Sequence, residues 1–359
     1  MLRFQQKSIQ ATFELVRAGL WEKESQLLHF GKIDYGEVLI IAEEQALTGL
    51  VTAGLEYVSD VKVPKEILLQ FIGESLQIEQ RNKDMNMFLA KLIEKLRKED
   101  IYAILLKGQG IAQCYENPLW RVSGDVDLLM SNDNFEKAKN SLLPLAANHK
   151  QERYYSKELN MTINQWSVEL HGSQRTGLSS SIDRKIDVVQ KDIFYGDNVR
   201  SWQNGKTTIF LPSADNDVFF VFTHFLKHFF KEGGVTLRQI CDWCRLLWTY
   251  REQLDSSLLE SRIKKVGLIS EWRAFAAVAV DYLGMPVEAM PLYRKDKKWS
   301  KKADKIIAFI LKGGEWRKLQ DTLLVGSIFP LSTLRFAPGI LLNVNWLKVK
   351  ESVFGDGNR

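Results

Sequence analysis

Two aspartates one residue apart, Asp125 and Asp127, begin an apolar run that continues to Met130. In a β-strand, residues i and i+2 point to the same face, so these carboxylates face one way while Val126 and Leu128 face the other. Adjacent carboxylates repel each other unless a cation lies between them, and hard oxygen ligands select Mg²⁺ or Mn²⁺. An aspartate among apolar residues is also costly to bury without a cation. The pair therefore predicts a divalent-metal site of the kind that serves phosphoryl or nucleotidyl transfer.

Upstream of this pair, residues 101–106 form a short apolar run that ends in Lys107 and Gly108, a pattern typical of a buried strand that turns sharply into a helix. A turn glycine lets backbone N–H groups approach a phosphate, and Lys107 would add positive charge there. The alternative for Lys107 is a side chain that merely extends to the surface. Arg121, four residues before Asp125, carries a planar guanidinium that suits phosphate oxygens.

Downstream, residues 166–171 alternate in character and contain Glu169 and His171. Since these two residues share one face of the expected strand, Glu169 could bridge a metal and accept a proton while His171 orients substrate or shares that proton. Two plainer interpretations stay open. Glu169 would then be an ordinary solvent-facing strand residue, and His171 would make a structural hydrogen bond.

The order and spacing of these residues resemble the uncharacterised nucleotidyltransferase family, a bacterial branch of the DNA polymerase beta-like nucleotidyltransferase superfamily. The resemblance spans about residues 30 to 260. It rests on four segments: 106–108, 121–128, 168–171 and 234–242. The paired aspartates alone would be weak evidence, because such pairs occur by chance.

This resemblance implies a catalytic and metal-binding set of three carboxylates, Asp125, Asp127 and Glu169, that binds Mg²⁺ or Mn²⁺ as the cofactor. It also implies an NTP substrate held by backbone amides after the first strand. The superfamily has a serine after the turn glycine, whereas this chain has a glutamine, which leaves the mode of phosphate binding open. The expected nucleotide-binding residues are Lys107, Gly108, Gln109, Arg121 and Gly124.

A second group of candidates would contact the acceptor or support the site: His171, His224, Arg238 and Asp242. The resemblance includes a histidine on the helix that carries His224, and His228 lies four residues later, a spacing that can bind metal. Arg238 and Asp242 are also four residues apart. An ion pair along their own helix is the default for them, and contact with nucleotide or acceptor is the alternative.

Composition limits the partners. The chain has 359 residues, with 49 Lys plus Arg against 44 Asp plus Glu, and its basic residues are scattered, which argues against nucleic acid as a partner. We expect no membrane span, since no apolar stretch is long enough.

Three cysteines do not make a disulfide framework, so a reducing cytoplasm is expected. Cys241 and Cys244 lie in a helical pattern and are interpreted as packed thiols rather than a zinc or redox pair.

Periodicity predicts an α+β fold, in which a small mixed β-sheet unit of nucleotidyltransferase type is flanked by N- and C-terminal helical regions. We expect a helical region over 1–98, the α/β unit over 99–212 and a second helical region over 213–359. Expected strands cover 101–106, 125–130, 154–157 and 166–171. Helices are expected at 109–116 and at 135–143, the second capped by residues 132–134.

These observations favour a Mg²⁺-dependent nucleotidyltransferase that moves a nucleoside monophosphate from an NTP to a hydroxyl of a small-molecule acceptor. A sugar or polysaccharide precursor, an antibiotic-like polyol and a protein hydroxyl are all candidate acceptors. The alternative is a module that keeps the fold and binds a nucleotide or a partner without catalysis. Nucleotide addition to RNA is disfavoured, because no basic stripe with interleaved aromatic residues is evident. The sequence does not indicate the oligomeric state.

Overall fold

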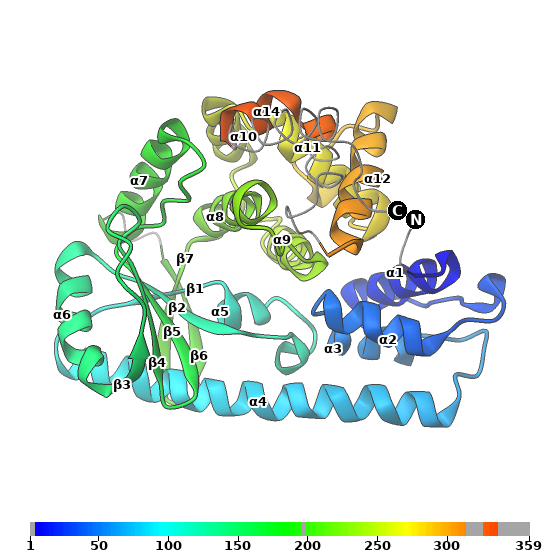
Figure 1. Cartoon of the computed structure of the whole chain (residues 1–359), viewed down its shortest axis with the longest axis horizontal. Coiled ribbons are helices and arrows are strands. Elements are labelled where there is room, and N and C mark those ends of the chain that lie inside the picture. The colour runs from blue at the N-terminus through cyan, green and yellow to red at the C-terminus, as the bar shows by residue number, and fades with distance from the viewer. Residues whose placement is uncertain (1–3, 196–198, 314–325, 337–359) are drawn as a thin grey trace, which may run out of the picture.

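The computed structural model describes residues 4–195, 199–313 and 326–336. Its centre is one mixed seven-stranded sheet with helices before and after it in the chain, so the predicted α+β class is confirmed (Figure 1). The strands follow the spatial order β3-β4-β5-β2-β1-β7-β6. Their bounds are β1 Ile104–Leu106, β2 Asp125–Leu129, β3 Ala146–His149, β4 Glu158–Ile163, β5 Trp166–His171, β6 Val199–Asn204 and β7 Thr207–Pro212.

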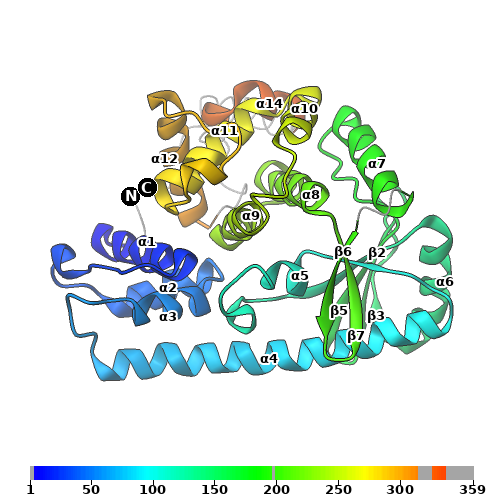
Figure 2. The same ribbon diagram turned by 180° about the vertical axis from the view of Figure 1, so that it is seen from behind.

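The N-terminal helices are α1 Gln6–Trp21, α2 Tyr35–Glu44, α3 Thr48–Glu56 and α4 Lys65–Lys98. Helix α4 is long enough to run beneath both the other three helices and the sheet (Figures 1 and 2). Helices α1 and α3 pack closely because glycines lie at their contact: a Cβ on Gly54 would be 2.0 Å from the Leu15 carbonyl oxygen. The N-terminal region is thereby joined to the sheet by one continuous helix.

The two faces of the sheet have different partners. Val126 and Leu128 of β2 point to the face that packs against α4 and α6 (Asn132–Leu142), in a core shared with Leu89 and Phe135. Alternation sends Asp127 to the opposite face, which α8 and α9 approach. One face is thus a sealed apolar layer, and the other carries the polar residues of interest.

The remaining helices follow or connect the strands. They are α5 Gly108–Ala112, α7 Ser180–Tyr195, α8 Ala214–Lys227, α9 Leu237–Thr249, α10 Ser256–Val266, α11 Ile269–Ala277, α12 Lys297–Leu311 and α14 Pro330–Phe336. Phe329 is buried against Phe229 and Phe230 and so completes the C-terminal core, whereas Trp316 and Trp346 lie outside the described residues. No described helix combines the length and apolarity required to cross a bilayer.

Several expected boundaries were wrong. Residues 154–157 form a turn, and the strand follows them as β4, because the two tyrosines that suggested a strand are solvent-exposed. The first strand covers only 104–106, and the helix after it ends at Ala112. Helix α6 begins at Asn132, three residues early, because Ser131 caps it by accepting a hydrogen bond from the Asn134 N–H.

Candidate functional site

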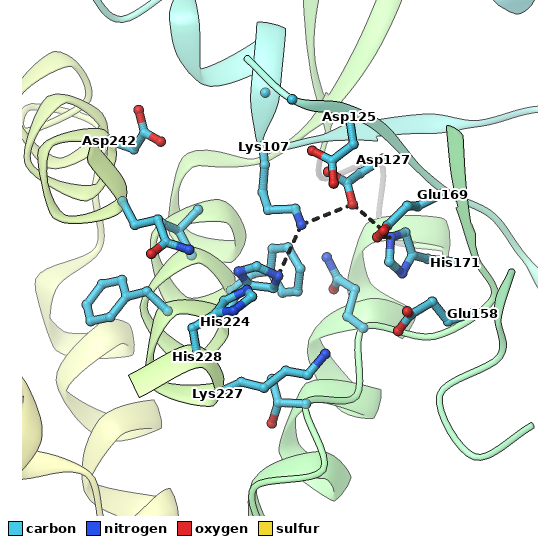
Figure 3. A pocket seen from close by; sticks show the side chains of 18 of the residues that line it. Lys107, Asp125, Asp127, Glu158, Glu169, His171, His224, Lys227, His228 and Asp242 are labelled. Carbon is cyan, nitrogen blue, oxygen red and sulfur yellow. Dashed lines mark hydrogen bonds and ion pairs between the residues drawn. The ribbon is translucent and has the colours of Figure 1, made fainter. Parts of the chain in front are cut away.

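A cavity of about 400 Å³ lies over the polar face of the sheet, between the β2–β5 pair and helices α8 and α9 (Figure 3). Residues that the sequence analysis singled out line this cavity, including Lys107, Asp127, Glu169 and His224. His228, directly after α8, also lines the cavity. Residues of the sheet and residues of the helices that follow it therefore meet at this cavity.

Strand pairing sets the core of the site. Strand β5 pairs with β2 in parallel so that Glu169 lies directly opposite Asp127, and β4 pairs with β5 so that Asn160 lies opposite Glu169. His171, two residues after Glu169, reaches back to Asp127 with Nε2 2.9 Å from Oδ1. Three neighbouring strands thus place a row of polar side chains on one face.

Asp127, Glu169 and His171 form a group whose ligand atoms all lie within 4.8 Å of one another. Asp127 is 0 % exposed, and its Oδ1 already accepts from His171 and from Lys107, whose Nζ lies at 3.0 Å. Its Oδ2 has no hydrogen-bond partner among the described residues. A buried carboxylate oxygen without a partner is unfavourable, and its position beside a second carboxylate and an imidazole fits a divalent cation.

Asp125, the other expected metal ligand, lies outside that three-residue group but near it (Figure 3). The negative charge of Asp127, together with burial, raises the pKa of Asp125. Two carboxylates that interact this strongly would both be stabilised in the charged form by a cation between them. A role for Asp125 in metal binding stays a prediction.

The titration of the cluster reflects its mutual contacts. Burial alone would lower the pKa of His171, but hydrogen bonds to Asp127 and Glu169 raise it to about 9. Burial would raise the pKa of Glu169, yet the hydrogen bond and charge of His171 lower it. Without a cation the cluster is therefore held together by a protonated imidazole between two carboxylates.

Lys107 occupies a strained position at the end of β1. Its φ of 51° is rare for a residue with a side chain, and Gly108 follows with φ 41°. Burial would lower the pKa of Lys107, but the charges of Asp127 and Asp125 raise it. Its Nζ also lies 3.1 Å from His224 Nε2. Burial and the charge of Lys107 hold the pKa of His224 well below its usual value, so a neutral ring faces the ammonium group.

Arg121 lines the cavity, but its guanidinium contacts protein partners. Its side chain is 4 % exposed and donates two 2.7 Å hydrogen bonds to the carboxylate of Asp242 on α9, where Tyr115 also donates. We expected Asp242 to pair with Arg238 along the helix, but its oxygens accept from Arg121 and Tyr115, which come from another part of the chain. Arg238 Nη1 instead donates to the Val122 carbonyl at 2.7 Å.

The residues of the predicted nucleotide-binding turn differ in how they meet the cavity. Gly108 and Gly124 line the cavity with Lys107; Gly124 is exposed, whereas Gly108 is buried. The Gln109 side chain is buried, donates to Asn82 Oδ1 and accepts from the Ser123 hydroxyl. Only the backbone of Gln109 is thus left for the expected contact with nucleotide.

Several lining residues escaped the sequence analysis, among them Glu158, Asn160 and Gln174. Glu158 and Asn160 are alternate residues of β4 and lie opposite His171 and Glu169. That alternation was visible in the sequence, but its significance depends on the pairing of β4 with β5. Gln174 lies just beyond β5, and no local pattern singles it out.

Comparison with known proteins gives one positive result. Neither a curated protein nor a solved structure matches the chain. A family model matches residues 31–284, which is more than half of the chain and includes every site residue discussed above. The chain belongs to the family described as uncharacterised nucleotidyltransferases.

Proposed function

We propose that the protein is a Mg²⁺- or Mn²⁺-dependent nucleotidyltransferase that moves a nucleoside monophosphate from an NTP to a hydroxyl of a small-molecule acceptor. One observation carries the proposal: the buried Asp127, with an unpartnered Oδ2, lies within ligand distance of Glu169 and His171 in a cavity of a nucleotidyltransferase-family chain. A bound divalent cation would supply charge neutralisation at the phosphorus and a lower pKa for the attacking hydroxyl.

The chain's own groups have distinct tasks in this reaction. Asp127, Glu169 and His171 would hold the cation, with Asp125 at its edge. Lys107 extends from the β1 turn toward the same carboxylates, where its ammonium group can bind a phosphate oxygen once a cation takes over Asp127. Glu169, with a carboxylate held in its charged form, is placed to accept the proton of the acceptor hydroxyl.

Arg121 and Asp242 would hold the segment before β2 in place. Their buried two-bond ion pair ties α9 to the segment that leads into β2. Arg238, from the same helix, holds the Val122 carbonyl, three residues before Asp125. These contacts fix the entry to the aspartate strand, which is a positioning role rather than the triphosphate contact expected of Arg121.

A second candidate, a nucleotide-binding module without catalysis, is favoured by one observation. The Lys107 ammonium group and a protonated His171 already neutralise Asp127 without a metal. Such a module would bind nucleotide equally well with and without Mg²⁺ and would release no pyrophosphate.

The test is transfer of label from each of the four α-labelled NTPs to a small-molecule cell extract, with pyrophosphate release measured in parallel. We expect Mg²⁺- or Mn²⁺-dependent transfer that Glu169→Gln lowers by about a hundredfold or more, since the carboxylate binds the cation and accepts the proton. Glu136→Gln, on the exposed side of α6, is the matched control. Absence of transfer with every NTP, together with metal-independent nucleotide binding, would support the second candidate.

A further inference from the structure

Gln174 lines the cavity with a buried amide that the protein leaves unsatisfied. Its side chain is 3 % exposed, and neither its oxygen nor its nitrogen has a hydrogen-bond partner among the described residues. Buried polar groups are normally paired, so an orphaned amide is unfavourable in a free protein. Asp127 Oδ2 and Arg238 Nε, in the same cavity, share this property. Three residues with such unpaired atoms therefore line the cavity in which a substrate would bind.

The backbone around Gln174 is fixed by α7. Gln190 accepts a hydrogen bond from the Gln174 N–H and donates one to the Gly172 carbonyl, both at 2.9 Å. The next residue, Arg175, donates two hydrogen bonds to Asp187 at 2.9 and 2.7 Å. These contacts hold the segment by its backbone and by other side chains. The side-chain amide of Gln174 is therefore held in position although it makes no hydrogen bond to the described residues.

The strand order gives the cavity two chemically different sides. In the order β4-β5-β2-β1, Lys107 follows β1 on one side of the Asp127–Glu169 pair, and Asn160 of β4 lies on the other. On the β4 side, Arg153 pairs with Glu158 at 3.1 Å. A triphosphate is thus accommodated on the Lys107 side, and the β4 side, where Lys150 also lines the cavity, offers hydrogen-bonding groups to the acceptor.

We propose that Gln174 and Asn160, which line the same cavity, bind the acceptor, and that this acceptor is a polyhydroxylated ring such as a sugar or cyclitol. An amide carries both donors and an acceptor, and each hydroxyl can donate and accept, so one amide can bind two neighbouring hydroxyls. The inference rests on the proposed function, because a bound hydroxyl must lie near Asp127 and Glu169 to receive the nucleotidyl group.

The direct test is saturation-transfer NMR with four probes: D-glucose, D-mannose, N-acetylglucosamine and myo-inositol, without nucleotide or metal. We expect at least one probe to bind the wild-type protein and to bind Gln174→Leu at least about tenfold more weakly, the effect of a lost hydrogen-bonded amide. Gln203→Leu, an exposed glutamine on β6, is the matched control and should bind like the wild type. Equal binding to Gln174→Leu, or binding of none of the four, would overturn the inference.

Two further readouts separate this role from others. Gln174→Leu should unfold at the wild-type temperature or higher, because no protein hydrogen bond is lost; a lower temperature would indicate a structural role and contradict the proposal. A change in NTP affinity without a change in sugar binding would assign Gln174 to the nucleotide and also overturn it. Sugar binding with no nucleotidyl transfer would contradict the proposed function alone, since the probes are tested without NTP.

Discussion

Glu169 lies directly across the β2–β5 pairing from Asp127, at the one register position where two buried strands bring carboxylates together on the same face. Paired strands hold opposed side chains within contact distance, so these two carboxylates repel each other. His171 bridges them, with Nε2 2.9 Å from Asp127 and 3.5 Å from Glu169. The strand pairing therefore creates a site that a positively charged group stabilises.

Lys107 and a divalent cation should compete for Asp127. In Lys107→Met, we expect the affinity for Mn²⁺ alone to rise, because the ammonium group no longer neutralises the carboxylate. NTP affinity should fall about 10- to 100-fold in the same variant, the loss of one charge-assisted hydrogen bond. Titrations of each ligand measure both effects, with Lys91→Met, at an exposed position of α4, as the control. Unchanged NTP affinity would show that Lys107 serves only as a counter-ion.

The Arg121–Asp242 pair should act through stability. Asp242→Asn leaves the Arg121 guanidinium buried without a matching charge, and we expect a loss of about 3–5 kcal/mol in the free energy of unfolding. Replacement of both partners, as in Arg121→Met with Asp242→Leu, should cost less than the single change. Urea unfolding measures both proteins. A double variant less stable than Asp242→Asn would contradict this account.

The buried thiols should make stability pH-dependent. Burial raises the pKa of Cys114, Cys241 and Cys244 above the value in an unfolded chain, so the folded state favours the protonated thiol. This contribution is complete below about pH 8.5 and is lost as the pH rises, by about 1.4 kcal/mol per pH unit for each thiol. Urea unfolding between pH 8 and 10 tests the slope, which Cys244→Ala should reduce. An unchanged slope would exclude that thiol as its source.

The sequence predicted what depends on local periodicity and on family resemblance. The strand expected at 125–130, its two faces and the α+β class follow from spacing alone; the structure confirms the class and has the strand as Asp125–Leu129. The proximity of Glu169 to Asp127 depends on which strands pair, and the resemblance supplied it where periodicity could not. The resemblance also led us to expect Arg121 at the phosphates, whereas its partner lies 121 residues away on α9.

Other differences have equally specific causes. Tyr154 and Tyr155 have high strand propensity, but they lie exposed in a turn. Strand propensity reflects packing on a half-buried surface, and these two side chains do not pack against the core. Asp242 was assigned to a neighbour on its own helix because spacing reveals only local partners. Gln174 was missed because an orphaned amide is recognisable only once the surrounding contacts are known.

The central claim is a metal-dependent nucleotide site on Asp127, and calorimetric titration tests it most directly. ATP, GTP, CTP and UTP are titrated into the wild-type protein, Asp127→Asn and the exposed control Asp133→Asn, each with and without Mg²⁺. We predict that at least one NTP binds the wild type and the control at least about tenfold more tightly with Mg²⁺, and that Asp127→Asn loses this gain. Nucleotide binding that is independent of Mg²⁺, or that survives unchanged in Asp127→Asn, would contradict the account.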